Sequence, residues 1–310
     1  MLLALGVLLT AGLFADEPAN PATPDAYVGR WNIRLTDADD TFIGGWFNVE
    51  KKDGGLAGAV VWRWGSVLPA TKVEVRDGTL RLVREEKAGK PDVFEARLQG
   101  SALQGQVRYA DGKVHHFEGK RAPDLSSTSP PRWGQPVALF DGKTLDGWKL
   151  RDPKAKMGWA VVGGELAVVE PKGNADLMNE RAFQDQKLHL EFNVEPKSNS
   201  GVYLRGRYEV QILDDPSKTT EQHGCGALYS RIAPRSDATK PAGEWQAFDL
   251  TLVGRRLTVV LNGQTIIDDA DVDGITGGAF DPFEGEPGRL MLQGDHGKVR
   301  FRNIVLTPAE

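Results

Sequence analysis

The sequence has little cysteine and no surplus of positive charge, and each shortage excludes a class of protein. Cys225 is the only cysteine among 310 residues, so an intramolecular disulfide and a CxxC metal or redox motif are both excluded. Lys and Arg number 38 against 43 Asp and Glu, which gives a formal net charge of -5. Proteins that bind nucleic acids without specificity carry an excess of basic side chains. We therefore expect no nucleic-acid partner.

Common catalytic signatures and helical periodicity are also missing. The chain has no HExxH, P-loop or GxSxG pattern, which removes the simplest assignments to a metalloprotease, a nucleotide-binding enzyme or a serine hydrolase. No stretch of ~12 residues repeats apolar side chains at helical spacing. The 36 Gly and 18 Pro instead separate short runs that alternate in polarity. This pattern is typical of strands joined by turns and predicts an all-β protein.

The N-terminal apolar stretch, residues 1–15, carries no charge. It is short for a membrane span, since a spanning helix needs ~20 residues, and we expect no membrane span. A secretory signal peptide cut after Ala15 fits its layout, and predicts an exported protein, periplasmic or extracellular. The basic residues that normally precede such a stretch are missing. We therefore expect a start slightly upstream or an atypical signal, and a buried N-terminal helix is the alternative.

Composition divides the remaining chain into a leader, two β-rich segments and a linker. Residues 16–26 form a polar, Pro-rich leader, and residues 27–121 contain about eight short runs typical of strands. Residues 122–136, rich in Ser and Pro, predict a linker. Residues 137–308 form the second β-rich segment, in which strands again alternate in polarity. We expect two antiparallel sheets packed as a sandwich there.

The first segment predicts a small antiparallel β-barrel or sandwich. Asp-Gly pairs at 53–54, 77–78 and 111–112 separate its runs, and Asp-Gly suits the positive φ angles of a type I′ hairpin turn. The opening Gly29-Arg30-Trp31 resembles the start of a lipocalin-type barrel. The segment is either a small ligand-binding barrel or a packing module. A hollow interior would favour binding, and a filled interior would favour packing.

Several strings of the second segment, taken in their order and spacing, resemble one known family. They are LFDGKTLDGW (139–148), NSGVYLRG (199–206), YEVQILD (208–214), GALY (226–229), KPAGEW (240–245), LNG (261–263), LQ (292–293), HG (296–297) and FRNI (301–304). Together they resemble the 3-keto-disaccharide hydrolase family over residues 137–308. The resemblance implies a concanavalin-like jelly roll of two curved sheets that handles sugar on its concave face. It also implies exported proteins that act on oxidised glycosides.

The resemblance predicts a small oxidised glycoside or disaccharide as the substrate. The ketone of a 3-keto sugar acidifies the hydrogen on C2, so a base can remove that proton and form an enolate. The glycosidic oxygen then leaves from C1, and water adds to the resulting enone. The reaction needs a base, a group that stabilises the enolate and an acid for the leaving group.

Glu209 and Gln211 are two residues apart on one predicted strand, so they share a face opposite Tyr208. We predict that Glu209 is the catalytic base or acid and that Gln211 binds substrate. Arg205, just upstream, is predicted to clamp the enolate or a sugar hydroxyl, because arginine keeps its positive charge. The alternatives are a solvent-facing polar pair and a salt bridge between Arg205 and Glu209.

Glu191 is the second candidate carboxylate, on a predicted strand face that it shares with His189. If its strand lay beside that of Glu209, the two carboxyl groups could divide the acid and base roles, provided that their surroundings separated their pKa values. Exposure of this face to solvent is the alternative.

His296 lies in the polar segment Gln293–Gly297, between two predicted strands. Loops on a rigid scaffold commonly carry functional side chains, and imidazole titrates near neutral pH. We therefore predict a catalytic His296, with Asp295 orienting it, and we include Gln293 and Asp295 among the substrate-binding residues. A turn histidine with a structural hydrogen bond is the alternative.

Tyr229, Lys240 and Trp245 complete the predicted binding set. An aromatic ring can pack against the C–H face of a sugar, although core packing is the alternative for each aromatic residue. A sandwich that binds sugar without any catalytic group would be a carbohydrate-binding module, which is the second hypothesis for this segment.

We predict no cofactor and assign no residue to a metal site. Residues 269–274 match the start of a calcium loop, but Phe280 stands where that pattern needs a bidentate Glu. We interpret the run as a solvated acidic turn. Structural calcium elsewhere in the jelly roll stays open, because the sequence does not locate it.

Overall fold

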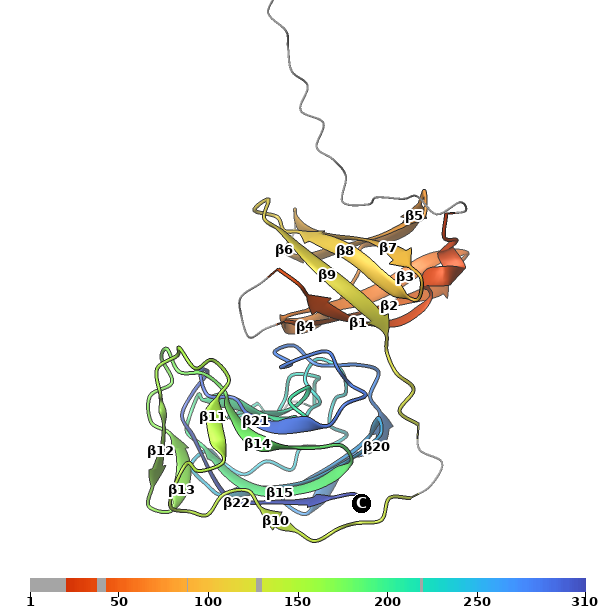
Figure 1. Ribbon diagram of the computed structural model, residues 1–310. Helices are drawn as coiled ribbons and strands as arrows, with labels where there is room; N and C mark the ends of the chain where they lie inside the picture. The colour runs from red at the N-terminus through yellow and green to blue at the C-terminus, as the bar shows by residue number, and fades with distance from the viewer. Residues whose placement is uncertain (1–20, 38–42, 88, 127–129, 218–219) are drawn as a thin grey trace, which may run out of the picture.

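The computed structural model describes residues 21–37, 43–87, 89–126, 130–217 and 220–310, and these form two β-rich units (Figure 1). The expected signal peptide and the first five residues of the expected leader lie outside the described residues. A short 3-10 helix, Pro24–Tyr27, precedes the first strand. In the part of the chain that is described, no helix is long and apolar enough to cross a membrane.

The N-terminal unit is a single curled antiparallel sheet. Its strands are β1 (Gly29–Leu35), β2 (Gly44–Lys52), β3 (Gly55–Trp62), β4 (Trp64–Pro69), β5 (Lys72–Arg76), β6 (Thr79–Lys87), β7 (Lys90–Gln99), β8 (Ala102–Arg108) and β9 (Val114–Arg121). They follow the order β4-β3-β2-β1-β9-β8-β7-β6-β5, and β3 also contacts β5. The sheet therefore curls into a barrel-like shape around its own core.

Two of the predicted Asp-Gly turns explain two of the hairpins of this unit. Asp53 and Gly54, between β2 and β3, have φ angles of 51° and 77°, and Asp77 and Gly78, between β5 and β6, have 47° and 67°. Positive φ at both central residues is the requirement of a type I′ turn, whose twist matches that of the strands. The prediction of a small antiparallel β unit is confirmed.

The interior of the N-terminal unit is filled with aromatic side chains. Trp31, Trp62, Phe94 and Phe117 are all buried, and the Trp62 ring meets Phe94 edge-on at a centroid distance of 5.3 Å. The Trp62 indole N–H donates a hydrogen bond to the Tyr109 hydroxyl (2.7 Å). This filled core favours a packing module over a ligand-binding barrel.

The C-terminal unit is a sandwich of two antiparallel sheets. Its strands are β10 (Val137–Ala138), β11 (Trp148–Leu150), β12 (Trp159–Val162), β13 (Glu165–Val168), β14 (Leu177–Phe183), β15 (Gln186–Val194), β16 (Asn199–Leu204), β17 (Tyr208–Leu213), β18 (Gln246–Val253), β19 (Arg256–Leu261), β20 (Gln264–Asp271), β21 (Gly288–Leu292) and β22 (Val299–Pro308). The eight-stranded sheet has the order β12-β13-β22-β15-β18-β19-β20, with β10 paired to β22, and the five-stranded sheet has the order β11-β14-β21-β16-β17. This arrangement confirms the expected two-sheet jelly roll.

Two-residue alternation builds the core between these sheets. Leu188, Leu190 and Phe192 of β15 are buried, and the Phe192 ring stacks on Phe248 of β18 at 4.8 Å. The turn Asn262-Gly263 joins β19 to β20 with φ angles of 52° and 81°, as the sequence predicted.

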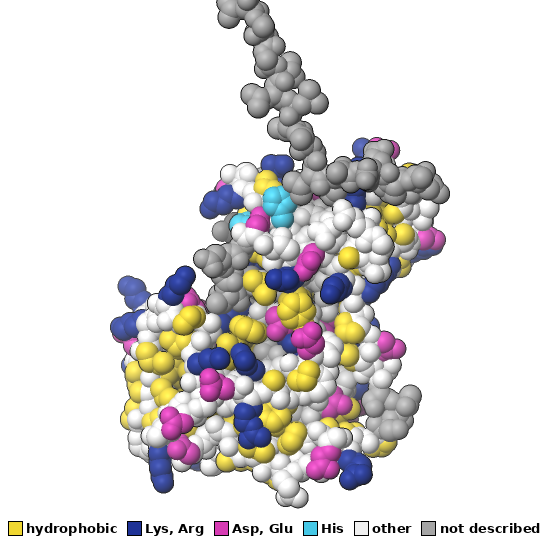
Figure 2. Space-filling view, in the orientation of Figure 1, with side chains coloured by type: hydrophobic (Ala, Val, Ile, Leu, Met, Phe, Trp, Pro, Cys, Tyr) yellow, Lys and Arg dark blue, Asp and Glu magenta, His cyan; other side chains and the backbone are white. Residues whose placement is uncertain are grey.

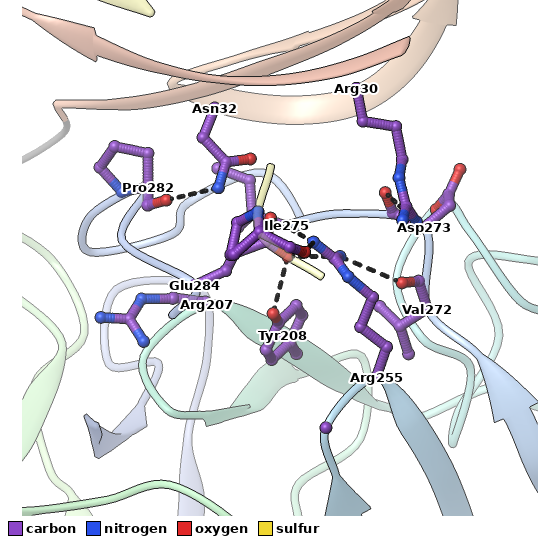
Figure 3. Close-up of polar contacts among 12 residues, drawn as sticks. Arg30, Asn32, Arg207, Tyr208, Arg255, Val272, Asp273, Ile275, Pro282 and Glu284 are labelled. Carbon is purple, nitrogen blue, oxygen red and sulfur yellow. Dashed lines mark hydrogen bonds and ion pairs between the residues drawn. The ribbon is translucent and has the colours of Figure 1, made fainter. Parts of the chain in front are cut away.

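The N-terminal unit rests on the side of the sandwich formed by the five-stranded sheet (Figure 1). Trp46 and Val61 of the N-terminal unit pack with the core of the sandwich, whereas Trp31, Trp62 and the other buried side chains of that unit form a separate core. Between the units lies the segment that joins β20 to β21, residues 272–287 (the bridging segment). The Asn32 amide donates a hydrogen bond to the carbonyl of Pro282 in this segment (2.9 Å; Figure 3).

A buried ion pair holds the bridging segment to the sandwich (Figure 3). Glu284 is fully buried and accepts hydrogen bonds from the Tyr208 hydroxyl (2.7 Å) and from Arg255 (2.8 and 3.1 Å). On the face of the molecule shown in Figure 2, acidic and basic side chains are intermixed over both units.

Candidate functional site

A pocket of about 400 Å³ opens where the outer face of the five-stranded sheet meets the N-terminal unit. Its volume lies within the range of roughly 300–1,000 Å³ that small-molecule sites occupy. Residues of both units line it: Trp64, Gly65, Asp176, Asn199, Tyr203, Glu209, Gln211, Tyr229, Gly277, Gly278, Gln293, Asp295 and His296.

Two paired strands, β16 and β17, form the floor of the pocket. Asn199 and Tyr203 of β16 line it together with Glu209 and Gln211 of β17, and Tyr203 pairs directly with Glu209 across the strands. Side chains two apart on a strand share a face. The residues of opposite parity on β17, including Tyr208, pack into the core, so strand alternation alone brings the acid to the surface of the pocket.

Glu209 is only 4% exposed although it lines the pocket. Burial raises its pKa to about 8, even though the hydrogen bond from Tyr203 and the charge of His296 both lower it. The nearby carboxylate of Asp176 raises it further. A carboxyl group with a pKa near the working pH can both accept and return a proton, as general acid–base catalysis requires.

His296 and Asp295 form a hydrogen-bonded pair on the loop that follows β21. The bond between the His296 Nδ1 and the Asp295 Oδ1 raises the pKa of the imidazole above its ordinary value. Burial would raise the pKa of Asp295, but His296 lowers it below the ordinary value. The pair therefore favours a positively charged imidazolium beside a carboxylate.

A second buried pair, Asp176 and Arg151, supports the pocket from the side of β14. The guanidinium of Arg151 lies 3.3 Å from the Asp176 carboxylate and donates to the carbonyls of Gly278 (2.6 Å) and Ala279 (2.9 Å). Burial raises the pKa of Asp176. Arg151 thus ties this acid to the bridging segment, which supplies Gly277 and Gly278 to the pocket wall.

Three amide side chains of the pocket have an acceptor atom without a partner. Among the described residues, the carbonyl oxygens of Asn199, Gln211 and Gln293 are buried and accept no hydrogen bond. Buried polar atoms in folded proteins are usually satisfied, and an exception calls for a water or a ligand. Three such oxygens around one pocket suit a ligand rich in hydroxyl donors.

The structure brings six of the ten predicted site residues into this pocket. They are Glu209, Gln211, Tyr229, Gln293, Asp295 and His296. The other four, Arg205, Glu191, Lys240 and Trp245, lie elsewhere, so the expectation that they share the pocket is wrong.

Arg205 lies in the turn between β16 and β17, and its side chain is completely buried away from the pocket. It donates to the Asp185 carboxylate (2.7 Å), the Gln184 carbonyl (2.7 Å) and the Gly254 carbonyl (3.0 Å), so it forms no salt bridge with Glu209. Its backbone is in the left-handed region, with a φ angle of 54°, as part of the turn that joins the two strands. The strand alternation that points Tyr203 and Glu209 into the pocket therefore does not extend to Arg205.

Glu191, Trp245 and Lys240 belong to the outer face of the eight-stranded sheet. Arg302 donates to the Glu191 carboxylate (2.7 Å) and its guanidinium lies over the Trp245 ring at 3.9 Å. The Lys240 ammonium donates to the Trp245 carbonyl (3.0 Å). These residues were misplaced because β15 pairs with β18 and β22, whereas Glu209 lies on the other sheet.

The structure also adds residues that the sequence analysis did not select. Asn199 and Tyr203 could have been found by applying to β16 the parity rule that selected Glu209 and Gln211. Asp176 and Trp64 carry no local signal, because long-range packing alone brings them to the pocket.

The acidic run at residues 269–274 is engaged in ion pairs. Asp269 accepts from Arg256 (2.7 Å), and Asp273 pairs with Arg231. Across the described residues, no group of three or more His, Cys, Asp and Glu side chains is arranged to hold a metal ion.

Comparison with known proteins gives one assignment for the C-terminal unit. The family model of the 3-keto-alpha-glucoside-1,2-lyase-like domain matches residues 135–307, which confirms the resemblance derived from the sequence. No curated protein matches the chain.

Three solved structures from Parabacteroides distasonis, each described as a proposed glycosyl hydrolase, are similar to this chain. The first is 25% identical, with a TM-score of 0.48, and the match covers 58% of this chain and 92% of that one. The second is 18% identical, with a TM-score of 0.47 and coverages of 56% and 94%. The third is 24% identical, with a TM-score of 0.45 and coverages of 56% and 100%. Because these TM-scores are below 0.5, the assignment rests on the family match.

Proposed function

Because residues 135–307 match its model, the chain belongs to the 3-keto-alpha-glucoside-1,2-lyase-like family, and we propose that its pocket cleaves 3-keto glucosides. The observation that carries the proposal is the placement of two proton-transfer groups, Glu209 and His296, in one pocket. Elimination next to a ketone needs one group that removes a proton from carbon and another that protonates the departing oxygen.

In the proposed reaction, the Glu209 carboxylate removes the proton from C2 and the electron pair moves into the C3 ketone as an enolate. The enolate returns the pair to form the C1–C2 double bond as the C1–O bond breaks. The His296 imidazolium gives its proton to the departing oxygen, so an alcohol and an unsaturated 3-keto sugar are formed. Addition of water across C1 and C2 completes the net hydrolysis.

The hydrogen bonds of the pocket support this division of roles. Asp295 stabilises the imidazolium of His296, which suits an acid. The hydrogen bond from Tyr203 lowers the pKa of Glu209 against the effect of burial, so it stabilises the carboxylate that a base requires. A base whose pKa is about 8 is also stronger than an ordinary carboxylate.

The amide oxygens of Asn199, Gln211 and Gln293 are proposed to accept hydrogen bonds from sugar hydroxyls. Each lacks a partner within the described structure, so a bound sugar would satisfy an acceptor that is otherwise unpaired.

We also propose that the protein is exported and meets its substrate outside the cytoplasm.

The test is incubation of the purified protein with 3-keto-trehalose or a 3-keto aryl glucoside, next to the same sugar without the ketone. We expect release from the keto sugar alone. The Glu209→Gln variant should lose at least about 100-fold in kcat, since general acid–base groups contribute roughly 10²–10⁴-fold.

Glu191→Gln is the matched control, because Glu191 is a carboxylate on the other sheet, paired with Arg302. It should keep activity close to that of the unaltered protein. Cleavage of the plain sugar, or an active Glu209→Gln variant, would contradict the mechanism. Tight binding of a sugar without cleavage would instead support the carbohydrate-binding module.

A further inference from the structure

We propose that Trp64, from the N-terminal unit, is the platform for the second ring of a disaccharide substrate. Trp64 lies outside residues 135–307, the part matched by the family model, yet it lines the same pocket as Glu209 and His296. This inference rests on the proposed function, because it assumes that the pocket holds a sugar.

The exposure of Trp64 sets it apart from the other tryptophans of the chain. Its exposed fraction is 54%, whereas Trp31, Trp46 and Trp62 of the same unit are 3% exposed or less. Removing a large apolar ring from water lowers the free energy, so an exposed indole favours binding of a partner that covers it. Indole rings also pack well against the C–H face of a sugar, because they offer a flat apolar surface.

The backbone on both sides of Trp64 is fastened to the C-terminal unit. The carbonyl of Arg63 accepts a hydrogen bond from the Gly278 N–H (2.7 Å). On the other side, the Ser66 hydroxyl lies 2.9 Å from the His223 Nε2, and the Val67 N–H donates to the Ser230 hydroxyl (3.0 Å). The indole therefore projects from an anchored hairpin, and a platform held in place loses little conformational freedom when a ligand binds.

A close backbone contact brings this hairpin to the pocket wall. A β-carbon on Gly277 would lie 2.0 Å from the carbonyl oxygen of Gly65, so the two segments meet with no side chain between them. Gly277 belongs to the bridging segment, whose Pro282 is bonded to Asn32 of the N-terminal unit (Figure 3). The N-terminal unit thus supplies part of the pocket wall, next to the bridging segment.

This placement decides which part of the substrate reaches Trp64. The oxidised ring must lie against the strands of the floor, because Glu209 has to reach C2 and His296 has to reach the glycosidic oxygen. Trp64 enters from the other unit and meets the group attached at C1. The Arg63 guanidinium lies 4.4 Å from the centre of the Trp64 ring, which helps to fix the orientation of the indole.

The test compares a 3-keto disaccharide with methyl 3-keto-glucoside, which has no second ring. Trp64→Ala should lower kcat/KM for the disaccharide about tenfold, the effect of losing a stacking contact of ordinary strength. It should leave the methyl glucoside within about twofold, and Trp64→Phe should recover part of the loss. Trp245→Ala, which removes a tryptophan beside Arg302 on the other sheet, is the control and should affect neither substrate.

Binding to the Glu209→Gln variant separates this inference from the proposed function. By titration calorimetry, adding Trp64→Ala should weaken binding of the 3-keto disaccharide about tenfold and leave the methyl glucoside unchanged. Equal effects on both ligands, no effect on either, or no binding of the disaccharide would overturn the platform even if the unaltered protein cleaves keto sugars. If that protein cleaves neither substrate while Trp64→Ala selectively weakens disaccharide binding, the platform stands and the cleavage proposal fails.

Discussion

A β-carbon on Gly201 would lie 2.3 Å from the Oε1 atom of Glu209 and 2.8 Å from its Cγ. Gly201 is on β16 and Glu209 is on the paired strand β17. The missing side chain therefore makes the space in which the buried carboxyl lies, and one glycine sets the position of the group to which we assign proton abstraction.

Gly201→Ala should consequently reduce the rate while leaving the fold in place. The new methyl group must push the carboxyl aside, and a displacement of about 1 Å can lower a rate by roughly 10²-fold. We expect kcat on a 3-keto glycoside to fall at least tenfold. Gly55→Ala is the control, since the nearest atom to a β-carbon there is 3.8 Å away. Unchanged kcat in Gly201→Ala would show that the position of Glu209 does not limit the reaction.

The pH–rate profile should be bell-shaped, and Asp295→Asn should move its alkaline limb to lower pH. The acidic limb reports loss of the proton from Glu209, and the alkaline limb reports loss of the proton from His296, although the apparent values belong to the coupled pair. The hydrogen bond with Asp295 is the main cause that raises the pKa of His296. Removing the carboxylate should therefore let His296 deprotonate earlier.

Asp249→Asn is the matched control for this shift, because Asp249 bonds His189 (2.7 Å) on the other sheet. The measurement is kcat/KM against pH for the three proteins. An alkaline limb that stays in place in Asp295→Asn would contradict the assignment of that limb to His296.

The stability of the protein should fall as the pH rises from about 4.5 to about 8, and Glu209→Gln should flatten this fall. The pKa of Glu209 is raised from 4.5 to about 8, so the folded state holds this proton more tightly than the unfolded state. The stabilisation is complete below the unfolded value and is lost as the pH rises through the folded value, by up to about 1.4 kcal/mol per pH unit. Urea unfolding at several pH values measures it. If the free energy of unfolding depended on pH in the same way in both proteins, the pKa of Glu209 would not be raised by folding, which would contradict the prediction.

Arg205→Ala should lower stability with little effect on catalysis. The substitution removes three hydrogen bonds of a buried guanidinium, including the ion pair with the partly exposed Asp185. Breaking a fully buried ion pair costs about 3–5 kcal/mol, so we expect a smaller loss here. Below the melting temperature, we expect kcat/KM to stay within about threefold, because Arg205 lies away from the pocket. A folded Arg205→Ala variant that has lost activity would restore the role that the sequence suggested for it.

The residues of the site differ in how far the sequence could predict them. Glu209 and Gln211 were predictable because their side chains follow a local rule, the two-residue period of a strand, and β17 keeps that period. His296 and Asp295 were predictable as a polar break between two strands. Arg205 was not, since the turn that contains it, with φ of 54°, ends the alternation one residue after Leu204.

Glu191 shows a different failure of prediction. Its side chain does point to the polar face of its strand, as alternation requires, but that strand pairs with β18 and β22 in the eight-stranded sheet. Alternation fixes which residues share a face, and it carries no information about which sheet the strand joins.

The sequence by itself determined the all-β class, the Asp-Gly and Asn-Gly hairpins and the alternation that turns Glu209 away from the core of the sandwich, because each depends on neighbouring residues and on the geometry of the extended chain. Only the tertiary structure decided that Asp176 and His296 meet Glu209, that Glu191 and Trp245 lie on the other sheet, and that Trp64 reaches the pocket from the N-terminal unit. These arrangements follow from packing segments that are far apart in the chain around shared cores, and that packing depends on contacts which no local pattern encodes.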